Sequence, residues 1–141
     1  MKDETQKWLT YAAENLSSAR LLLKSKLYNP CLQNVQQSVE KNLKALLIEK
    51  AAILKKSHSI NELVTILSGM DTHVGLTETD CDLLDTIYLP SKYPLGSALP
   101  DFTPDEDLCR QCLTIAESVA ETIRGLLVET PPSDQQATDT E

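Results

Sequence analysis

Two of the four cysteines, Cys109 and Cys112, are separated by two residues, the spacing of redox pairs and of half a zinc site. A redox pair of this kind normally opens a helix in a β-α-β unit, and a structural zinc site needs four ligands. The chain has no second pair with this spacing, since Cys31 and Cys81 are isolated, and no strand-like alternation of useful length. We therefore predict that the four residues are reduced thiols packed in the core, with no bound metal.

The two histidines, His58 and His73, also stand alone rather than at a metal-ligand spacing. We expect His58, which lies just ahead of a short predicted helix, to make a local hydrogen bond or a cap. Nucleophilic triads, phosphate-binding loops and dinucleotide-binding glycine patterns are absent from the sequence. The residues therefore predict neither a catalytic set nor a cofactor.

The most informative residues lie in a predicted helix over about 30–51. Glu40 and Lys44 are one helical turn apart, which on a solvated face makes an ion pair that contributes about 0.2–0.5 kcal/mol. The segment resembles the signature of the HEPN family, small helical domains associated with nucleotide binding. The family's glutamine, its Glu-Lys pair and its Lys-Ala pair are matched by Gln37, Glu40, Lys41, Lys44 and Ala45.

Two further motifs extend the resemblance, which spans about residues 5–128. His58, Ile60 and Leu63 are similar to the family's H-x-L-x-x-L entry to a short helix. The family's Y-x-x-x-R-Y-P loop is matched from Tyr88 through Lys92, Tyr93 and Pro94, with lysine in place of arginine. Lysine keeps the charge but cannot bind phosphate in the bidentate manner of arginine.

The resemblance implies a helical bundle that dimerises and is encoded beside a minimal nucleotidyltransferase, as in toxin–antitoxin pairs. The leading hypothesis is a non-catalytic HEPN domain that binds such a partner, a nucleotide, or both. The residues that would form this site are Gln37, Glu40, Lys41, Lys44, His58, Tyr88, Lys92 and Tyr93.

An alternative hypothesis is an enzyme, either a HEPN-type ribonuclease or an accessory to phosphoryl transfer. Family nucleases carry R-x4-6-H, but Arg20 precedes His58 by 38 positions, and the other two arginines follow both histidines. The resemblance to the nuclease branch is therefore one of fold only.

The elements that must position these residues are five amphipathic helices. Asn29 and Pro30 are typical of a helix start, as are Thr77 with Asp80 and Thr103 with Pro104 and Glu106, while Gly69 suits a helix end. Prolines should end the fourth helix near Leu89. The expected ranges are 5–25, 30–51, 60–67, 77–89 and 103–129. They predict an all-α, antiparallel (up-and-down) bundle of about five helices, HEPN-like, over 1–129, with two short helices at one end, a loop over 90–102 and a disordered acidic tail over 130–141.

Charge is distributed unevenly along the 141 residues, whose net charge is -8. Residues 1–56 carry 10 basic and 5 acidic side chains, whereas residues 57–141 carry 3 and 16. The net charge argues against general nucleic-acid binding. The sequence has no signal peptide and no membrane-spanning run, so we expect a cytoplasmic protein. A symmetric homodimer is expected as well, because long aliphatic helices in a small chain leave apolar surface to bury.

Overall fold

The computed structural model describes residues 1–50, 56–92 and 103–129, and this part of the chain is all-α, as predicted. The five helices are α1 (Asp3–Lys24), α2 (Tyr28–Glu49), α3 (Ile60–Gly69), α4 (Glu78–Lys92) and α5 (Glu106–Glu129). None of the helices in the described ranges combines the length and apolarity needed to cross a membrane.

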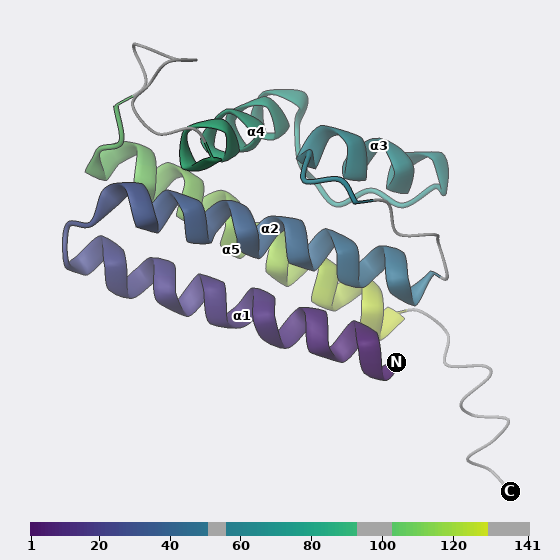
Figure 1. The fold of residues 1–141 in the computed structure, drawn as a ribbon. Helices are drawn as coiled ribbons and strands as arrows, with labels where there is room; N and C mark the ends of the chain where they lie inside the picture. The colour runs from purple at the N-terminus through teal and green to yellow at the C-terminus, as the bar shows by residue number, and fades with distance from the viewer. Residues whose placement is uncertain (51–55, 93–102, 130–141) are drawn as a thin grey trace, which may run out of the picture.

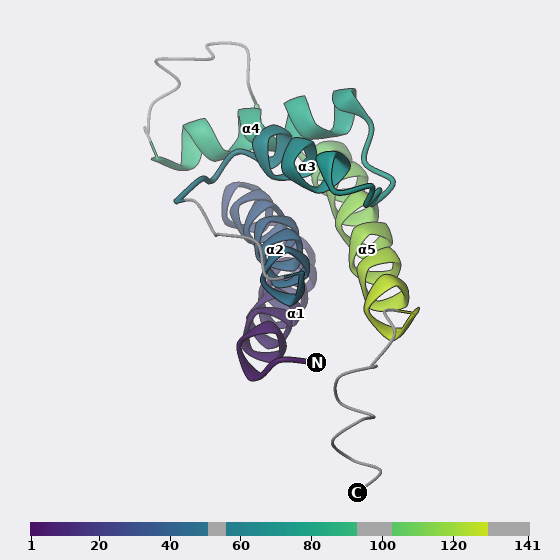
Figure 2. The ribbon, with the colours of Figure 1, turned by 90° about the vertical axis from the view of Figure 1, so that its right-hand side faces the viewer.

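The three long helices form the body of the molecule, and the two short ones lie across it (Figure 1). α1 and α2 are an antiparallel hairpin. α5 lies along this hairpin, antiparallel to α1 and in the same direction as α2, because α3 and α4 carry the chain back before α5 begins. Figure 2 shows α3 and α4 on one side of the long helices, with the opposite side left to α1 and α5. The short helices thus cover a side of the bundle rather than an end.

α2 is the central helix and contributes the largest share of the core. It packs against all four other helices, and thirteen of its 22 residues are buried. Apolar side chains recur at steps of three and four on α2, so they form one continuous stripe toward α1 and α5. The fully buried apolar residues on α2 are Cys31, Leu32, Val35, Val39, Leu43, Ala45, Leu46 and Leu47.

The predicted start of the second helix and the predicted end of the third differ from the structure. α2 begins at Tyr28 rather than at Pro30, and no side chain caps it. Pro30 is the third helical residue, a place where a missing N–H also costs nothing because the first four N–H groups lack partners. Gly69 is the last residue of α3 and does not take the left-handed conformation, which falls to Asp71 with φ 56°. Aspartate tolerates that region better than most residues.

The start of α4 is confirmed, but the end of α4 and the start of α5 differ from the prediction. Thr77 and Asp80 form a reciprocal capping box at α4, with Asp80 N 3.0 Å from Thr77 Oγ1 and Thr77 N 3.2 Å from an Asp80 carboxylate oxygen. However, α4 continues through Pro90 to Lys92. α5 begins after Asp105, whose carboxylate accepts a hydrogen bond from Leu108 N at 2.8 Å, so Asp105 replaces the predicted Thr103 as its cap.

Candidate functional site

The carboxylate of Glu40 is buried at the centre of the site. Gln36, Glu40 and Lys44 recur every four residues and therefore share one face of α2. Glu40 is 3% exposed and Lys44 is 6% exposed, and Lys44 Nζ lies 2.8 Å from Glu40 Oε2. The pair is thus a buried ion pair rather than the solvated one that spacing alone suggests. Such a pair is strongly coupled, because removing one partner strands the other charge away from water.

His58 reaches the same carboxylate from the segment before α3. Its Nδ1 lies 3.1 Å from Glu40 Oε2 and 3.3 Å from Glu40 Oε1, while its side chain remains 49% exposed. Gln36 Nε2 donates to both Glu40 Oε1 and the His58 carbonyl, each at 3.3 Å. His58 therefore does not cap α3. It ties the residues ahead of α3 to the middle of α2.

Aromatic rings lie on both sides of this polar group. Trp8 of α1 lies under the Lys44 ammonium, with Nζ 5.7 Å from the ring centroid, a cation–π contact. Tyr88 of α4 stacks on His58, with ring centroids 5.1 Å apart and an interplanar angle of 14°. Residues of α1, of α2, of the segment before α3 and of α4 thus meet around Lys44, Glu40 and His58.

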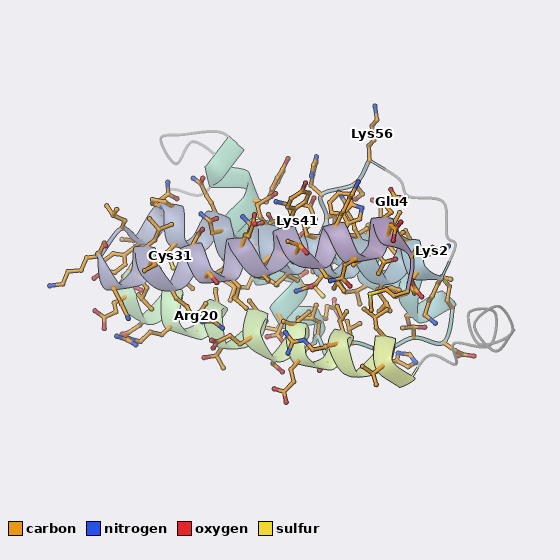
Figure 3. The ribbon with its side chains drawn as sticks, turned by 90° about the horizontal axis from the view of Figure 1, so that it is seen from below. Lys2, Glu4, Arg20, Cys31, Lys41 and Lys56 are labelled. Carbon is orange, nitrogen blue, oxygen red and sulfur yellow. The ribbon has the colours of Figure 1, made fainter. Side chains whose placement is uncertain are left out.

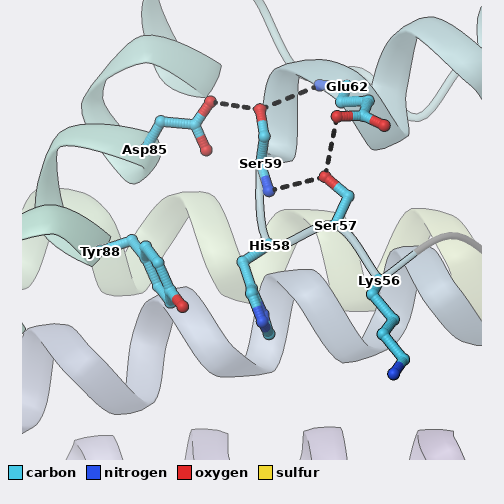
Figure 4. Close-up of a pocket in the computed structure, with 7 residues that line it drawn as sticks. All are labelled: Lys56, Ser57, His58, Ser59, Glu62, Asp85 and Tyr88. Atoms are coloured by element: carbon cyan, nitrogen blue, oxygen red, sulfur yellow. Dashed lines mark hydrogen bonds between the residues drawn. The ribbon is translucent and has the colours of Figure 1, made fainter. Parts of the chain in front are cut away.

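The His58–Tyr88 stack borders a hollow of about 520 Å³ (Figure 4). Ser57 and Ser59 line it with hydroxyl groups that are already paired. Ser57 Oγ donates to Glu62 at 3.0 Å, and Ser59 Oγ donates to Asp85 at 3.0 Å. The residues that line the hollow are Lys56, Ser57, His58, Ser59, Glu62, Asp85 and Tyr88.

Asp85 of α4 fixes the start of α3 and with it the position of His58. Its carboxylate accepts hydrogen bonds from Ile60 N at 2.6 Å and Asn61 N at 3.2 Å. Asn61 Nδ2 adds a further bond at 3.0 Å. Ser59 is the cap that belongs to the helix itself, because its Oγ accepts from Glu62 N at 3.2 Å. Figure 4 shows Asp85 and Ser59 facing each other across the start of α3.

The charges around the hollow are mostly negative. Lys56 is its one cationic lining residue in the described ranges, against the carboxylates of Glu62 and Asp85. Residues 57–91 contain six acidic residues and no lysine or arginine. The α3–α4 side of the molecule is therefore an acidic surface with an aromatic pair at the hollow.

The structure brings together five of the eight predicted site residues. Glu40, Lys44, His58 and Tyr88 are in contact, and Gln37 Nε2 donates to Gln36 Oε1 at 2.8 Å. Lys41 belongs to a different group, because its Nζ donates to Asn15 Oδ1 of α1 at 2.7 Å. Lys92 is the last residue of α4, and its side chain lies outside the described part, as does all of Tyr93.

Seven residues of this arrangement are not among the predicted ones: Trp8, Gln36, Lys56, Ser57, Ser59, Glu62 and Asp85. Gln36 could have been predicted from the sequence, since it precedes Glu40 by the same four residues that separate Glu40 from Lys44. Asp85 had no such signal, because only the packing of α4 against α3 brings it to the hollow, whereas Lys56 lies two positions before the predicted His58.

The cysteines are buried and not at this site. Burial raises the pKa of the Cys31 thiol. It also raises the pKa of Cys81 to about 11 and the pKa of both Cys109 and Cys112 to about 12. A thiol with a raised pKa is a poor nucleophile at neutral pH. Within the described ranges, no three His, Cys, Asp or Glu side chains are arranged to hold a metal ion.

Comparison with known proteins places the chain in a family. The family description "HEPN domain" matches residues 5–126, and the chain belongs to the HEPN family. A protein of Methanocaldococcus jannaschii named "Putative toxin MJ1304" is 28% identical over 130 residues, which cover 84% of each chain.

Two solved structures have the same fold. The crystal structure of TT1696 from Thermus thermophilus superposes with a TM-score of 0.69 at 23% identity, covering 88% of this chain and 98% of that one. The crystal structure of ST0689, an archaeal HEPN homologue, gives a TM-score of 0.66 at 26% identity, covering 89% and 98%.

Proposed function

We propose that this chain is a non-catalytic HEPN domain that works by binding a nucleotidyltransferase-like protein, as one member of a toxin–antitoxin type pair. The observation that carries the proposal is the contact of Glu40 with both Lys44 and His58. This contact holds the side chains of the family motif in one arrangement, and it presents the His58–Tyr88 stack at the surface. The name of the Methanocaldococcus jannaschii relative supports the toxin–antitoxin setting.

This contact of Glu40 with Lys44 and His58 is suited to binding rather than to proton transfer by Glu40 or Lys44. Both side chains are almost wholly buried and neutralise each other, so neither group can reach a substrate. A fixed aromatic surface, by contrast, lowers the entropy lost when a partner binds. Aromatic side chains are also the residues most often found at the centre of protein interfaces.

A nucleotide is a second ligand that the hollow could hold, because a base can stack on the exposed part of the His58–Tyr88 pair. The hollow is less suited to binding the phosphates of a nucleotide. Lys56 is the single cation among the described lining residues, and Glu62 and Asp85 repel an anion. A protein partner that presents basic residues complements this side of the molecule better than a triphosphate does.

The enzymatic alternative rests on one specific observation. The contact of His58 Nδ1 with Glu40 holds the imidazole in a fixed orientation while half of the side chain stays exposed, as the carboxylate of a hydrolase triad does for its base. RNA cleavage by the purified protein, abolished by His58→Ala and retained by His73→Ala, is the result that would support this alternative and contradict the binding proposal.

Titration calorimetry tests the binding proposal directly. ATP, GTP and a nucleotidyltransferase encoded beside this chain are titrated into the wild type, Tyr88→Ala, Lys56→Ala, Lys92→Ala and the control Lys41→Ala. We expect the nucleotidyltransferase to bind, with at least a tenfold loss on Tyr88→Ala and little change on Lys41→Ala, whose ammonium bonds Asn15 away from the hollow. Nucleotide binding weakened by Lys56→Ala or Lys92→Ala would favour the nucleotide instead. Failure of all three ligands would overturn the proposal.

A further inference from the structure

The Glu62 carboxylate lines the hollow beside the His58–Tyr88 stack and is held by the chain through one oxygen only. Its Oε2 accepts a hydrogen bond from Ser57 Oγ at 3.0 Å, and Ser57 Oγ in turn accepts one from Ser59 N at 3.1 Å. The other oxygen, Oε1, accepts no hydrogen bond from a described residue. Glu62 therefore presents a charged acceptor whose position is already fixed.

Asp85, the second carboxylate of the hollow, is fully used by the chain itself. Its Oδ1 accepts from Ile60 N, and its Oδ2 accepts from Ser59 Oγ and from both the backbone and the side chain of Asn61. Asp85 thus adds negative charge to the hollow without offering an open acceptor. A donor group that enters the hollow therefore binds Glu62.

The aromatic wall of the hollow indicates what kind of donor fits. His58 and Tyr88 lie nearly parallel, at an interplanar angle of 14°, and the His58 side chain is 49% exposed. A guanidinium group is planar, stacks on aromatic faces and forms forked hydrogen bonds with a carboxylate. It is also more weakly hydrated than an ammonium group, so it loses less on leaving water. A flat aromatic wall beside a carboxylate therefore suits arginine better than lysine.

Lys56 is the lining residue that opposes a second cation. Its side chain is exposed and forms no ion pair with a described residue. Figure 3 shows it pointing outward from the molecule, and in Figure 4 it points away from the Glu62 carboxylate. Lys56 therefore weakens the attraction of the hollow for a cation but does not fill the space beside Glu62.

We propose that the hollow binds an arginine side chain of the partner protein, with its guanidinium stacked on the exposed part of the His58–Tyr88 pair and hydrogen-bonded to Glu62. The proposed function supplies the partner, and the residues of the hollow supply the choice of arginine. An arginine within a protein fits better than the free amino acid, whose own carboxylate would bring a further negative charge beside Glu62 and Asp85.

NMR titration of the full chain with short peptides tests the choice of side chain. The probes are the capped tripeptide Gly-Arg-Gly and its counterparts with lysine or citrulline at the centre. We expect the arginine peptide to shift the backbone amide signals of residues 56–62 and 85–88 saturably. Its Kd should be at least threefold lower than that of the lysine peptide, and the uncharged citrulline peptide should bind most weakly. Equal binding of the arginine and lysine peptides, or no saturable shift with arginine, would overturn the proposal.

Three variants test which groups bind the arginine peptide. Glu62→Gln removes the charge but keeps an acceptor for Ser57, whereas Asp82→Asn removes an exposed charge of α4 outside the hollow. We expect the Kd to rise at least fivefold in Glu62→Gln and by less than about twofold in Asp82→Asn. Lys56→Ala should lower the Kd by about twofold, because it removes a repelling charge. Equal effects of Glu62→Gln and Asp82→Asn, or weaker binding in Lys56→Ala, would contradict a specific arginine site.

Calorimetry with the nucleotidyltransferase separates this proposal from the proposed function. Binding that is at least tenfold weaker in Glu62→Gln than in the wild type supports both. A nucleotidyltransferase that binds the wild type and Glu62→Gln equally well would overturn the arginine proposal and leave the proposed function standing. Selective binding of the arginine peptide by a chain that does not bind the nucleotidyltransferase would support the arginine site and overturn the proposed function.

Discussion

Asp85 of α4 caps α3 from outside that helix, with its carboxylate 2.6 Å from the backbone N of Ile60. The same carboxylate also accepts from Asn61, so it satisfies N–H groups that have no partner within α3. Because His58 lies two residues before Ile60, this contact between two helices also positions the hollow. The contact between Asp85 of α4 and the start of α3 is therefore part of the candidate site.

Asp85→Ala should lower the free energy of unfolding by roughly 1–3 kcal/mol, because it leaves the buried N–H of Ile60 without an acceptor. Asp82→Ala is the matched control. Asp82 lies exposed on the same helix, and among the described residues its carboxylate accepts one hydrogen bond, from the Asn61 side chain, so its loss should cost about 0.5 kcal/mol or less. Urea unfolding followed by circular dichroism measures both. Equal losses would mean that the cap has no special role.

Glu40→Gln should lower the free energy of unfolding by about 3–5 kcal/mol, because it leaves the Lys44 ammonium buried without a counter-charge. Adding Lys44→Met should restore part of that loss, since both charges are then absent. Glu106 and Arg110 have the same spacing on α5 but are exposed, so Glu106→Gln should cost less than about 1 kcal/mol. A double variant whose loss is the sum of the two single losses would show that Glu40 and Lys44 are not coupled.

Stability should fall at alkaline pH through the buried thiols. Burial raises the pKa of Cys112 from the usual 9 to about 12, so the folded chain holds this proton more tightly than the unfolded chain. The resulting contribution to stability is complete below pH 9 and is lost as the pH rises through about 12. Urea midpoints for the wild type and Cys112→Ala should converge as the pH is raised above 9. A gap between them that is constant with pH would contradict this.

Acid should weaken the join between the start of α1 and the end of α2. Burial alone would raise the pKa of Glu49, but hydrogen bonds from Lys2 N at 3.0 Å and Thr5 Oγ1 at 2.9 Å, with nearby positive charge, lower it below 4.5. The stabilisation is present above pH 4.5 and is lost as the pH falls through the lowered pKa. Glu49→Gln should therefore lose less stability than the wild type as the pH falls from about 5 to about 3. Parallel losses for the two proteins would argue against this role of Glu49.

The helices could be predicted because their apolar residues recur with the period of a helix. Leu32, Val35 and Val39 show this on α2, and all three are fully buried. Boundaries were less predictable, since local preference competes with packing. Thr103 and Pro104 are typical of a helix start, yet Asp105 caps α5 because its carboxylate reaches Leu108 N.

The candidate site could be predicted only along α2. Glu40 and Lys44 share a helical face by spacing, but spacing does not say that this face is buried. The contact of Glu40 with His58 joins residues 18 positions apart, and the stack of His58 on Tyr88 joins residues 30 apart. Both depend on how α3 and α4 pack on α2, which no local pattern encodes.

The burial of Glu40 also constrains how this chain can change over evolutionary time. A mutation that removes the Glu40 carboxylate strands the Lys44 ammonium and releases His58, so it is tolerated only when Lys44 changes with it. Natural variants of this chain should therefore keep Glu40 and Lys44 together or lose both. Lys41, whose ammonium bonds the neutral Asn15, is free to diverge alone.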